Sequence, residues 1–180
     1  HLELCRDIAQ KFNNDFNTPE FLRAPEPLIQ KEFSRIMSLK DGMKKMSKSD
    51  PSDLSRINLT DKKEEISNKI KKAKTDTMPM PDDDKNLSKR PETENLLGIY
   101  SSLRNQKLED SINEFKGKQF SDFKVKLSEI LVETISPISK EIKKLLNDEK
   151  YLDEILLKGS EKAGKIASKK ITEIKELVGF

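Results

Sequence analysis

The stretch DGMKKMSKSDP at residues 41–51 places two lysines and two serines around a single methionine. Lys45 and Lys48 each carry a mobile ammonium group, and Ser47 and Ser49 each carry a hydroxyl. Together with the backbone N–H groups of a loop, these side chains are suited to surrounding a chain of phosphate groups. A solvated surface loop is the alternative interpretation, because lysine and serine are both common on protein surfaces.

Two residues near the ends of this stretch indicate a segment that moves. Gly42 stands before the lysines and serines and Pro51 after them, and both favour a hinge or a turn. The sequence contains no glycine-rich phosphate loop of the GxxxxGK type, so phosphate binding here would depend on lysines of a flexible segment. Closure of such a segment would place positive charge where negative charge develops during a reaction.

The composition indicates one domain or a small pair of lobes. Of the 180 residues, 33% are hydrophobic and 37% are charged, the formal net charge is +3 and the pI is about 8.8. The apolar residues recur at helical spacing, which favours a packed helical fold over disorder. Alternating basic and acidic blocks suit contact with a polyanion on one face, although a genome that favours Lys, Asn and Ile would produce much of the same pattern.

Cysteine and histidine usage restricts the chemistry further. Cys5 is the only cysteine and His1 the only histidine, which excludes an intramolecular disulfide and a zinc site built from these residues. A reducing compartment, the cytoplasm, is therefore expected. No apolar run approaches the roughly 20 residues of a membrane span. Because the acidic triplet at 82–84 has no other ligands nearby, we interpret it as a solvated turn and predict no protein metal site.

The first half of the chain is predicted to alternate a few short elements with loops. Residues 2–12 form an amphipathic helix that lacks an N-cap residue. Residues 35–39 are predicted to be a buried strand, and residues 56–60 a second short strand. Residues 75–91 contain three prolines and are predicted to be an extended connector.

The second half is predicted to be helical. Asp61 and Glu64 match a capping box that opens a helix with Ile66 and Ile70 on its buried face. Pro137 falls inside a longer helical pattern and should bend it. Further helices are predicted at residues 91–103, 108–115, 121–146, 151–159 and 160–179, which together would complete a bundle.

The last helical segment carries a basic ridge. Its lysines recur at i, i+4, i+7 and i+11, which places them on one face: Lys158, Lys162, Lys165 and Lys169. Apolar residues of the same segment, such as Ile166 and Ile174, are predicted to point toward the core. Such a ridge suits contact with RNA phosphates, and an ordinary solvated face is the alternative.

Several stretches of the sequence resemble the tryptophanyl-tRNA synthetases, a family of class I aminoacyl-tRNA synthetases, over essentially the whole chain. The string KMSKS at 45–49 is similar to the signature loop of this class. The similar stretches, in order, are HLELCRDIAQKF, RIMSL, KKMSKSDP, RPETENLLGIYSSL and GSEKAGKIA. The stretch MPMPDDDKNLSKRPE resembles the version found in alphaproteobacteria.

The resemblance implies an ATP-dependent activation of tryptophan to tryptophanyl-adenylate, followed by transfer to tRNA(Trp), with ATP entering as its Mg²⁺ complex. It implies that the residues of the signature loop line the ATP site: Lys45, Met46, Ser47, Lys48 and Ser49. Lys48 is the first choice for the catalytic pyrophosphate contact and Lys45 the second. Main-chain groups of Ile36 and Met46 would hold the adenine, since N–H and C=O groups can hydrogen-bond a purine edge. Core packing is the alternative role for both residues.

The resemblance also implies a domain order and an assembly. Residues 1–60 are expected to be a remnant of an α/β Rossmann-type catalytic domain, residues 61–91 a helix and connector, and residues 92–180 a helical anticodon-binding lobe. The fold class is therefore mainly α. We expect a homodimer for the whole enzyme, and we expect this chain to be its carboxy-terminal half, inactive alone, because the family's HxGH-type motif is absent. Gly42 stands where the family usually has proline, which should loosen the hinge.

Two other functions remain open. A tyrosine-specific synthetase shares the signature loop, but the helical stretches that follow it match the tryptophan enzymes better. A helical RNA-binding module without catalysis would leave the loop and the RIMSL strand unexplained.

Overall fold

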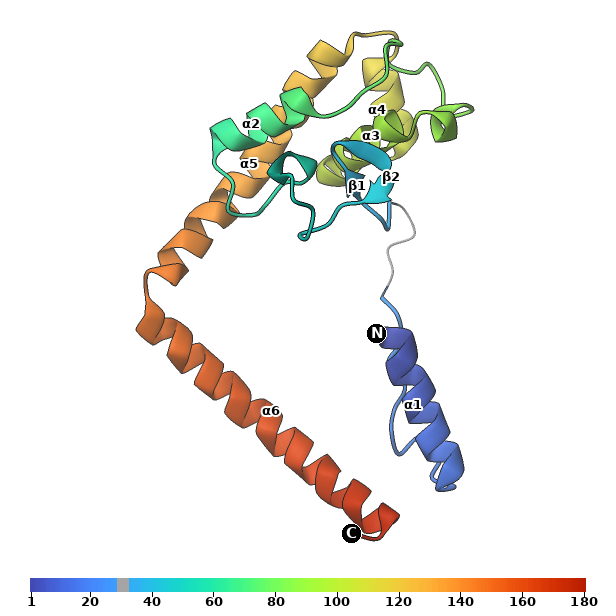
Figure 1. Cartoon of the computed structure of the whole chain (residues 1–180), viewed down its shortest axis with the longest axis vertical. Coiled ribbons are helices and arrows are strands. Elements are labelled where there is room, and N and C mark those ends of the chain that lie inside the picture. The colour runs from blue at the N-terminus through green and yellow to red at the C-terminus, as the bar shows by residue number, and fades with distance from the viewer. Residues whose placement is uncertain (29–32) are drawn as a thin grey trace. The chain divides into compact units, whose positions relative to one another are not determined.

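The computed structural model describes residues 1–28 and 33–180, and it is mainly helical, as predicted (Figure 1). The helices are α1 (Leu2–Asp15), α2 (Lys63–Lys72), α3 (Pro91–Arg104), α4 (Leu108–Phe115), α5 (Phe120–Leu146) and α6 (Glu149–Val178). Two 3-10 turns, η1 (Asp53–Ser55) and η2 (Leu87–Lys89), and two short strands, β1 (Met37–Ser38) and β2 (Asp41–Lys45), complete the described elements. No helix of the described segments is long and apolar enough to cross a membrane.

The chain divides into two compact units. One consists of His1–Gln30 with Asp148–Phe180, and the other of Lys31–Asn147. The domain ranges 1–60, 61–91 and 92–180 stay a prediction. Within the unit Lys31–Asn147, α2 packs along α5 (Figure 1).

The unit Lys31–Asn147 is built around one apolar core. Its α3 is buried on most sides, because strands, α4 and α5 all pack against it. Three aromatic rings, Tyr100, Phe115 and Phe123, meet edge to face with centroids 4.9–5.9 Å apart, a favoured geometry for aromatic pairs. The predicted stripe of α2 is confirmed, since Ile66 and Ile70 are both fully buried.

Two helix starts show where local sequence signals succeed and fail. Pro91 occupies the first turn of α3, as predicted. The predicted capping box of Asp61 and Glu64 is wrong. The Glu65 carboxylate accepts the N–H of Lys62 at 2.6 Å, one residue later, and Asp61 is buried in an ion pair with Lys69 instead.

The strand predictions are partly correct. β1 lies inside the predicted strand at 35–39 but is only two residues long, and it pairs antiparallel with β2. The sequence did not predict β2, because its residues Asp41 to Lys45 are mostly polar. Residues 56–60 form no strand. The carbonyl of Ser55, just before them, accepts the N–H of Leu39, so this stretch is held beside the hairpin by side-chain and backbone contacts rather than by a ladder.

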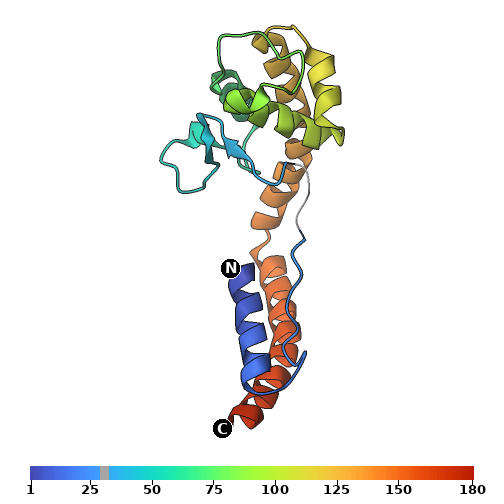
Figure 2. The ribbon, with the colours of Figure 1, turned by 90° about the vertical axis from the view of Figure 1, so that its right-hand side faces the viewer.

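The unit formed by the two chain ends has little core. α6 runs through Gly159 and Gly164 as one helix, where two helices were predicted, and none of its residues is buried. The expectation that it completes the bundle is wrong, because α6 belongs to the unit that contains α1. The contacts of this unit include a cluster of Phe12, Phe16 and Phe21, and Lys170 of α6, whose ammonium lies 4.1 Å from the centroid of the Phe21 ring. Figure 2 shows the ribbons of α1 and α6.

Candidate phosphate-binding turn

The β1–β2 hairpin supplies the first lysine of the candidate site. Lys45 is the last residue of β2 and lies opposite Met37 of β1. The next pair along the hairpin is Ile36 and Met46, where the Met46 N–H donates to the Ile36 carbonyl at 3.1 Å. The hairpin therefore fixes the position of the backbone at Met46, where the turn begins.

Residues 46–50 form a compact turn after the hairpin. Met46 is half-buried and packs against the core, whereas the Ser47, Lys48 and Ser49 side chains are exposed. The Ser49 N–H donates to the Ser47 hydroxyl at 3.1 Å, and the Asp50 N–H to the Ser47 carbonyl at 3.4 Å. These local bonds hold the turn together while leaving its side chains in solvent.

The two candidate lysines carry free charges. Lys45 and Lys48 are both exposed, and neither takes part in an ion pair with any residue that the structure describes. The neighbouring Lys44 differs, since its ammonium lies 3.4 Å from the Asp41 carboxylate. Two ammonium groups three residues apart on an exposed turn are available to an anionic ligand such as a phosphate chain.

The backbone groups predicted to hold adenine are partly occupied. The Met46 N–H and the Ile36 carbonyl bind each other. The Ile36 N–H and the Met46 carbonyl form no hydrogen bond within residues 1–28 and 33–180. Ile36 is 46% exposed, so its side chain is not part of the core, whereas Met46 does anchor the turn by apolar packing. A donor and an acceptor thus remain at the open end of the hairpin.

A buried amide fixes the other edge of β1. The Asn95 side chain of α3 accepts the Met37 N–H at 2.8 Å and donates to the Met37 carbonyl at 2.9 Å. Asn95 is 2% exposed, so both bonds are shielded from water. In an antiparallel pair, alternate residues direct their polar groups to opposite edges. The Asn95 side chain therefore pairs with the outer edge of β1, as a third strand would. The carbonyl of Ile36, the residue before β1, is directed the other way, toward Met46.

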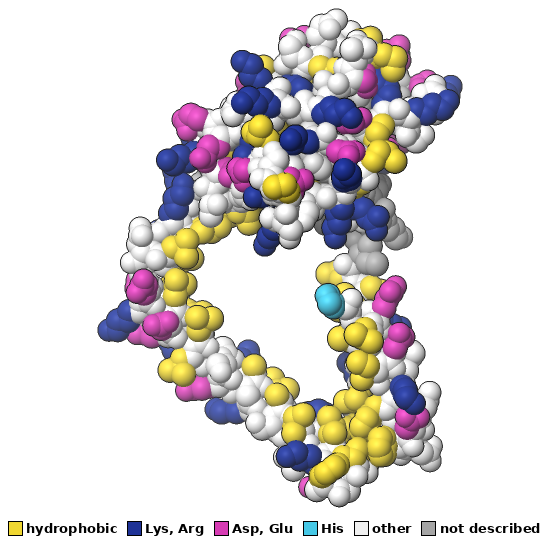
Figure 3. Space-filling model, in the orientation of Figure 1, with side chains coloured by type: hydrophobic (Ala, Val, Ile, Leu, Met, Phe, Trp, Pro, Cys, Tyr) yellow, Lys and Arg dark blue, Asp and Glu magenta, His cyan; other side chains and the backbone are white. Residues whose placement is uncertain are grey.

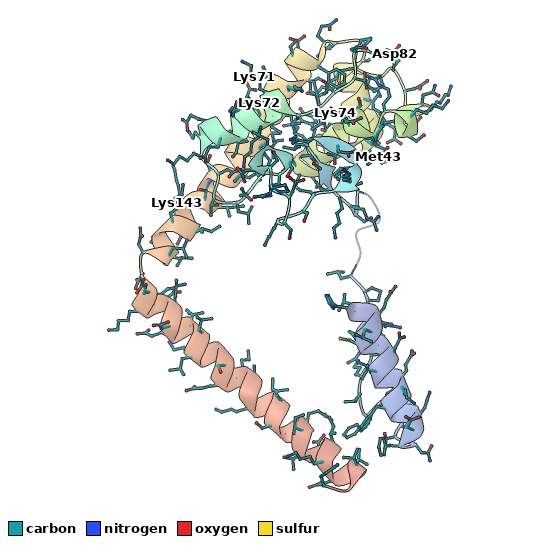
Figure 4. All side chains as sticks on the ribbon, viewed as in Figure 1. Met43, Lys71, Lys72, Lys74, Asp82 and Lys143 are labelled. Carbon is teal, nitrogen blue, oxygen red and sulfur yellow. The ribbon has the colours of Figure 1, made fainter. Side chains whose placement is uncertain are left out.

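Gly42 of β2 packs directly against the backbone at the start of α3. A side chain at this position would lie 2.5 Å from backbone atoms of Pro91 and Glu92. The Glu92 carboxylate pairs with the Lys74 ammonium at 2.7 Å, a contact that lowers the pKa of Glu92 and raises that of Lys74. Lys74 and Met43, the residue after Gly42, are labelled in Figure 4. The expectation of a looser hinge does not match this geometry, because Gly42 is a close-packed strand residue.

An ion cluster lies beneath the segment that follows the turn. The Lys69 ammonium of α2 is 2.6 Å from both the Asp53 and the Asp61 carboxylates, and Lys69 is 3% exposed. Burial disfavours the charged lysine, but the bonds to both carboxylates outweigh it and raise the pKa of Lys69. This cluster was not predicted, although the sequence carries one sign of it: Lys69 stands three residues after Ile66, within the apolar stripe of the helix.

The four predicted RNA-contacting lysines lie on α6, in the other unit. All of them are exposed and none forms an ion pair within the described parts of the chain: Lys158, Lys162, Lys165 and Lys169. The prediction that Ile166 points to the core is wrong, because it is 69% exposed, while Ile174 is half-buried. Hydrophobic and basic side chains therefore share the surface of α6 (Figure 3).

The other candidate locations offer less. A hollow of about 690 Å³ between α2 and α5 is lined by Lys71, Phe120, Lys124 and Glu129, among others, and by none of the predicted site residues. Lys124 donates there to the Ala73 carbonyl at 2.6 Å, so it closes the end of α2. No group of three or more His, Cys, Asp or Glu residues in the described regions is arranged to hold a metal ion.

Comparison with known families gives a consistent result. The model of the family described as tRNA synthetases class I (W and Y) matches residues 1–136. The tryptophan–tRNA ligase of Caulobacter vibrioides is 50% identical over 180 residues, which is all of this chain and 52% of the relative. The tryptophan–tRNA ligase of Rickettsia felis is 51% identical over 180 residues, which is all of this chain and 54% of the relative. The chain spans about half the length of the curated relatives it matches.

Solved structures show the same relationship. A tryptophanyl-tRNA synthetase from Mycoplasma pneumoniae superposes with a TM-score of 0.83 at 28% identity, covering all of this chain and 53% of the other. The Campylobacter jejuni enzyme, solved in complex with ADP and tryptophan, superposes with a TM-score of 0.66 at 25% identity, covering all of this chain and 54% of the other.

Proposed function

Because the chain belongs to the class I tRNA synthetases of the tryptophan and tyrosine group, we propose that it is part of a tryptophan–tRNA ligase. The observation that carries the proposal is the exposed turn at 45–49 with two unpaired ammonium groups. The relatives at about 50% identity are named for tryptophan, which favours tryptophan over tyrosine as the substrate. A non-catalytic RNA-binding module would have no use for such a turn.

The proposed reaction breaks the bridge between the α and β phosphates of ATP. The tryptophan carboxylate attacks the α phosphate, tryptophanyl-adenylate forms and pyrophosphate leaves with added negative charge. Lys48, seconded by Lys45, would stabilise that charge in the transition state. The ATP would enter as its Mg²⁺ complex, whose ion is held by the phosphates. Transfer of the activated amino acid to a hydroxyl of tRNA(Trp) breaks its bond to AMP, which leaves, and completes the cycle.

The turn has further groups suited to ATP. The hydroxyls of Ser47 and Ser49 lie beside the lysines and would donate to phosphate oxygens. The Ile36 N–H and the Met46 carbonyl would hold the adenine, because its edge presents an acceptor beside a donor. In this proposal residues 1–60 belong to the nucleotide-binding domain, the whole enzyme is a cytoplasmic homodimer, and the sequence described here is inactive alone.

The test uses an enzyme that carries this sequence within the full length of its relatives. Replacing Lys48 by alanine is expected to lower the rate of tryptophan-dependent ATP–pyrophosphate exchange by about 10²–10³-fold, as for the loss of one charge-stabilising donor. Tryptophan affinity should be unchanged. Lys44→Ala is the matched control, since Lys44 is paired with Asp41. Adenylate formation at the original rate in Lys48→Ala would show that Lys48 has no such role.

The α6 lysines are proposed to contact tRNA phosphates. Exchanging all four for glutamate should weaken tRNA binding and reduce the slope of log affinity against log salt by about three, if each neutralises one phosphate. Four exposed lysines of the other unit control for net charge: Lys62, Lys63, Lys89 and Lys107. An unchanged affinity and slope would assign the ridge to a solvated face.

A further inference from the structure

Arg56 contacts Asp50, the last residue of the phosphate-binding turn, from six residues downstream. Its guanidinium donates to the Asp50 carbonyl at 2.9 Å and to the Asn58 side chain at 3.3 Å, and it lies 3.1 Å from the Asp53 carboxylate. Asp50 is the residue whose N–H closes the turn onto Ser47. All three guanidinium nitrogens are therefore engaged, and one of them holds the exit of the turn.

The position of Arg56 is itself determined by α2. The Asp53 carboxylate that pairs with Arg56 also binds the buried Lys69 ammonium at 2.6 Å. The hydrogen bonds from Lys69 and Asn58 lower the pKa of Asp53, so it stays ionised at neutral pH. A continuous chain of contacts thus runs from the core face of α2 through Asp53 and Arg56 to the Asp50 carbonyl.

We propose that Arg56 is a positioning residue that fixes the backbone from which the Lys48 side chain extends. This inference rests on the proposed function of the turn. On the entry side, the hairpin and the packing of Met46 hold the backbone. On the exit side, Arg56 holds Asp50. Only residues 47–49 lie between these two points, so the backbone position of Lys48 is determined by both.

The contacts of Arg56 identify this role rather than one in general stability. Asp53 is 58% exposed at its side chain, and an ion pair with such a partner stabilises a fold little. A guanidinium presents its donors in a rigid fork, so one side chain can orient three acceptors at once. A lysine in its place would reach one acceptor at a time.

The first experiment measures the turn without any catalysis. Amide hydrogen exchange at residues 47–50 of the 180-residue chain is compared between the original sequence and Arg56→Met. Loss of a hydrogen bond to a charged donor should speed exchange there by about 10-fold. Arg104→Met, an exposed arginine on α3, is the matched control and should change nothing at the turn. Equal exchange in Arg56→Met and the original would overturn the proposal.

The second experiment measures the consequence in the enzyme of full length. Arg56→Met should lower kcat of ATP–pyrophosphate exchange by about 10-fold and leave the KM for tryptophan unchanged, and Arg56→Lys should recover part of the loss. If Arg56 acts through Lys48, adding Arg56→Met to Lys48→Ala should cost less than about 2-fold more. Fully additive losses would overturn the proposal.

The two experiments separate failure of this inference from failure of the proposed function. If Lys48→Ala has no effect on adenylate formation, the function of the turn is wrong, and the exchange measurement still decides whether Arg56 holds the backbone. If Lys48→Ala is inactive and Arg56→Met is normal in both measurements, the function stands and the role of Arg56 falls.

Discussion

Helices α5 and α6 share a residue pattern and differ in their surroundings. Both are long, rich in lysine and marked by an apolar residue at almost every turn. In α5 the stripe is buried from Phe123 to Ile135, with Phe123 and Leu127 fully enclosed by the core, whereas α6 has no buried residue. The comparison teaches that apolar periodicity predicts a helix and its candidate inner face, and that burial depends on what other elements pack against that face.

The largest difference between the two units in the free energy of unfolding should come from removing a buried charge. Lys69→Met leaves Asp61 buried without its partner, which is expected to lower the free energy of unfolding by about 3–5 kcal/mol. Lys162→Met on α6 removes an exposed lysine and should change it by less than about 0.5 kcal/mol. Urea unfolding of both variants measures the contrast. Equal stability would mean that the Lys69 cluster is far better hydrated than its burial indicates.

A matched leucine pair tests the same contrast for packing. Leu127→Ala opens a cavity beside α5 and should cost about 2–5 kcal/mol, because the lost apolar contacts are not replaced. Leu156 is 69% exposed, and Leu156→Ala should cost less than about 0.5 kcal/mol. Thermal and urea unfolding give both values. A cost at Leu156 as large as that at Leu127 would show that α6 packs against something in solution.

Acid sensitivity should also differ between the units. Burial opposes the charge of Asp76, but hydrogen bonds from Arg90 and Thr93 outweigh it and lower its pKa below 3.8. As the pH falls, the unfolded chain therefore takes up this proton first, so the stabilisation is complete above about pH 4 and is lost below it. Asp76→Asn should lower the free energy of unfolding by about 1.5–3 kcal/mol at pH 7, and by progressively less as the pH falls below about 4.

The control for this pH dependence lies on α6. Lys170 lowers the pKa of Glu173 as well, but both side chains of that pair are only half-buried, so Glu173→Gln should change the pH profile of stability less than Asp76→Asn does. Unfolding free energies at several pH values check both variants. Parallel profiles for Asp76→Asn and the original chain would contradict the assigned role of Asp76.

The smallest contrast concerns two glycines. Gly42→Ala places a methyl group 2.5 Å from the backbone of α3, and the resulting displacement should cost about 1–3 kcal/mol. Gly164 on α6 has open space around it, so Gly164→Ala should stabilise the helix by up to about 1 kcal/mol. Opposite signs in thermal unfolding are the expected result. A stabilising Gly42→Ala would mean that β2 does not pack on α3.

Much of the helical architecture was predictable because it is encoded locally. Apolar spacing located the helices of residues 91–146 closely, and Pro91 marked the start of α3. The two-residue strand β1 and the polar strand β2 carry little such signal. β1 exists because Asn95, 58 residues away, supplies the missing strand partner, and no local pattern contains that contact.

The candidate site divides in the same way. The types and spacing of Lys45 and Lys48 indicated phosphate chemistry, and the structure shows both side chains exposed and unpaired within its described residues. The residues that hold the turn were not predicted. Arg56 and Lys69 look like ordinary surface charges in the sequence, although a lysine inside an apolar stripe was an indication of a buried pair.

By itself, the sequence determined the helical content, the buried stripe of α2 and the chemical character of the turn, because these depend on neighbours within a few residues along the chain. Only the tertiary structure decided that α5 is enclosed and α6 is not, that Gly42 is packed rather than free, and that Asn95 and Arg56 hold the two edges of the site. Those outcomes depend on contacts between residues distant in sequence, and each contact forms only when both partners are brought together by the same core.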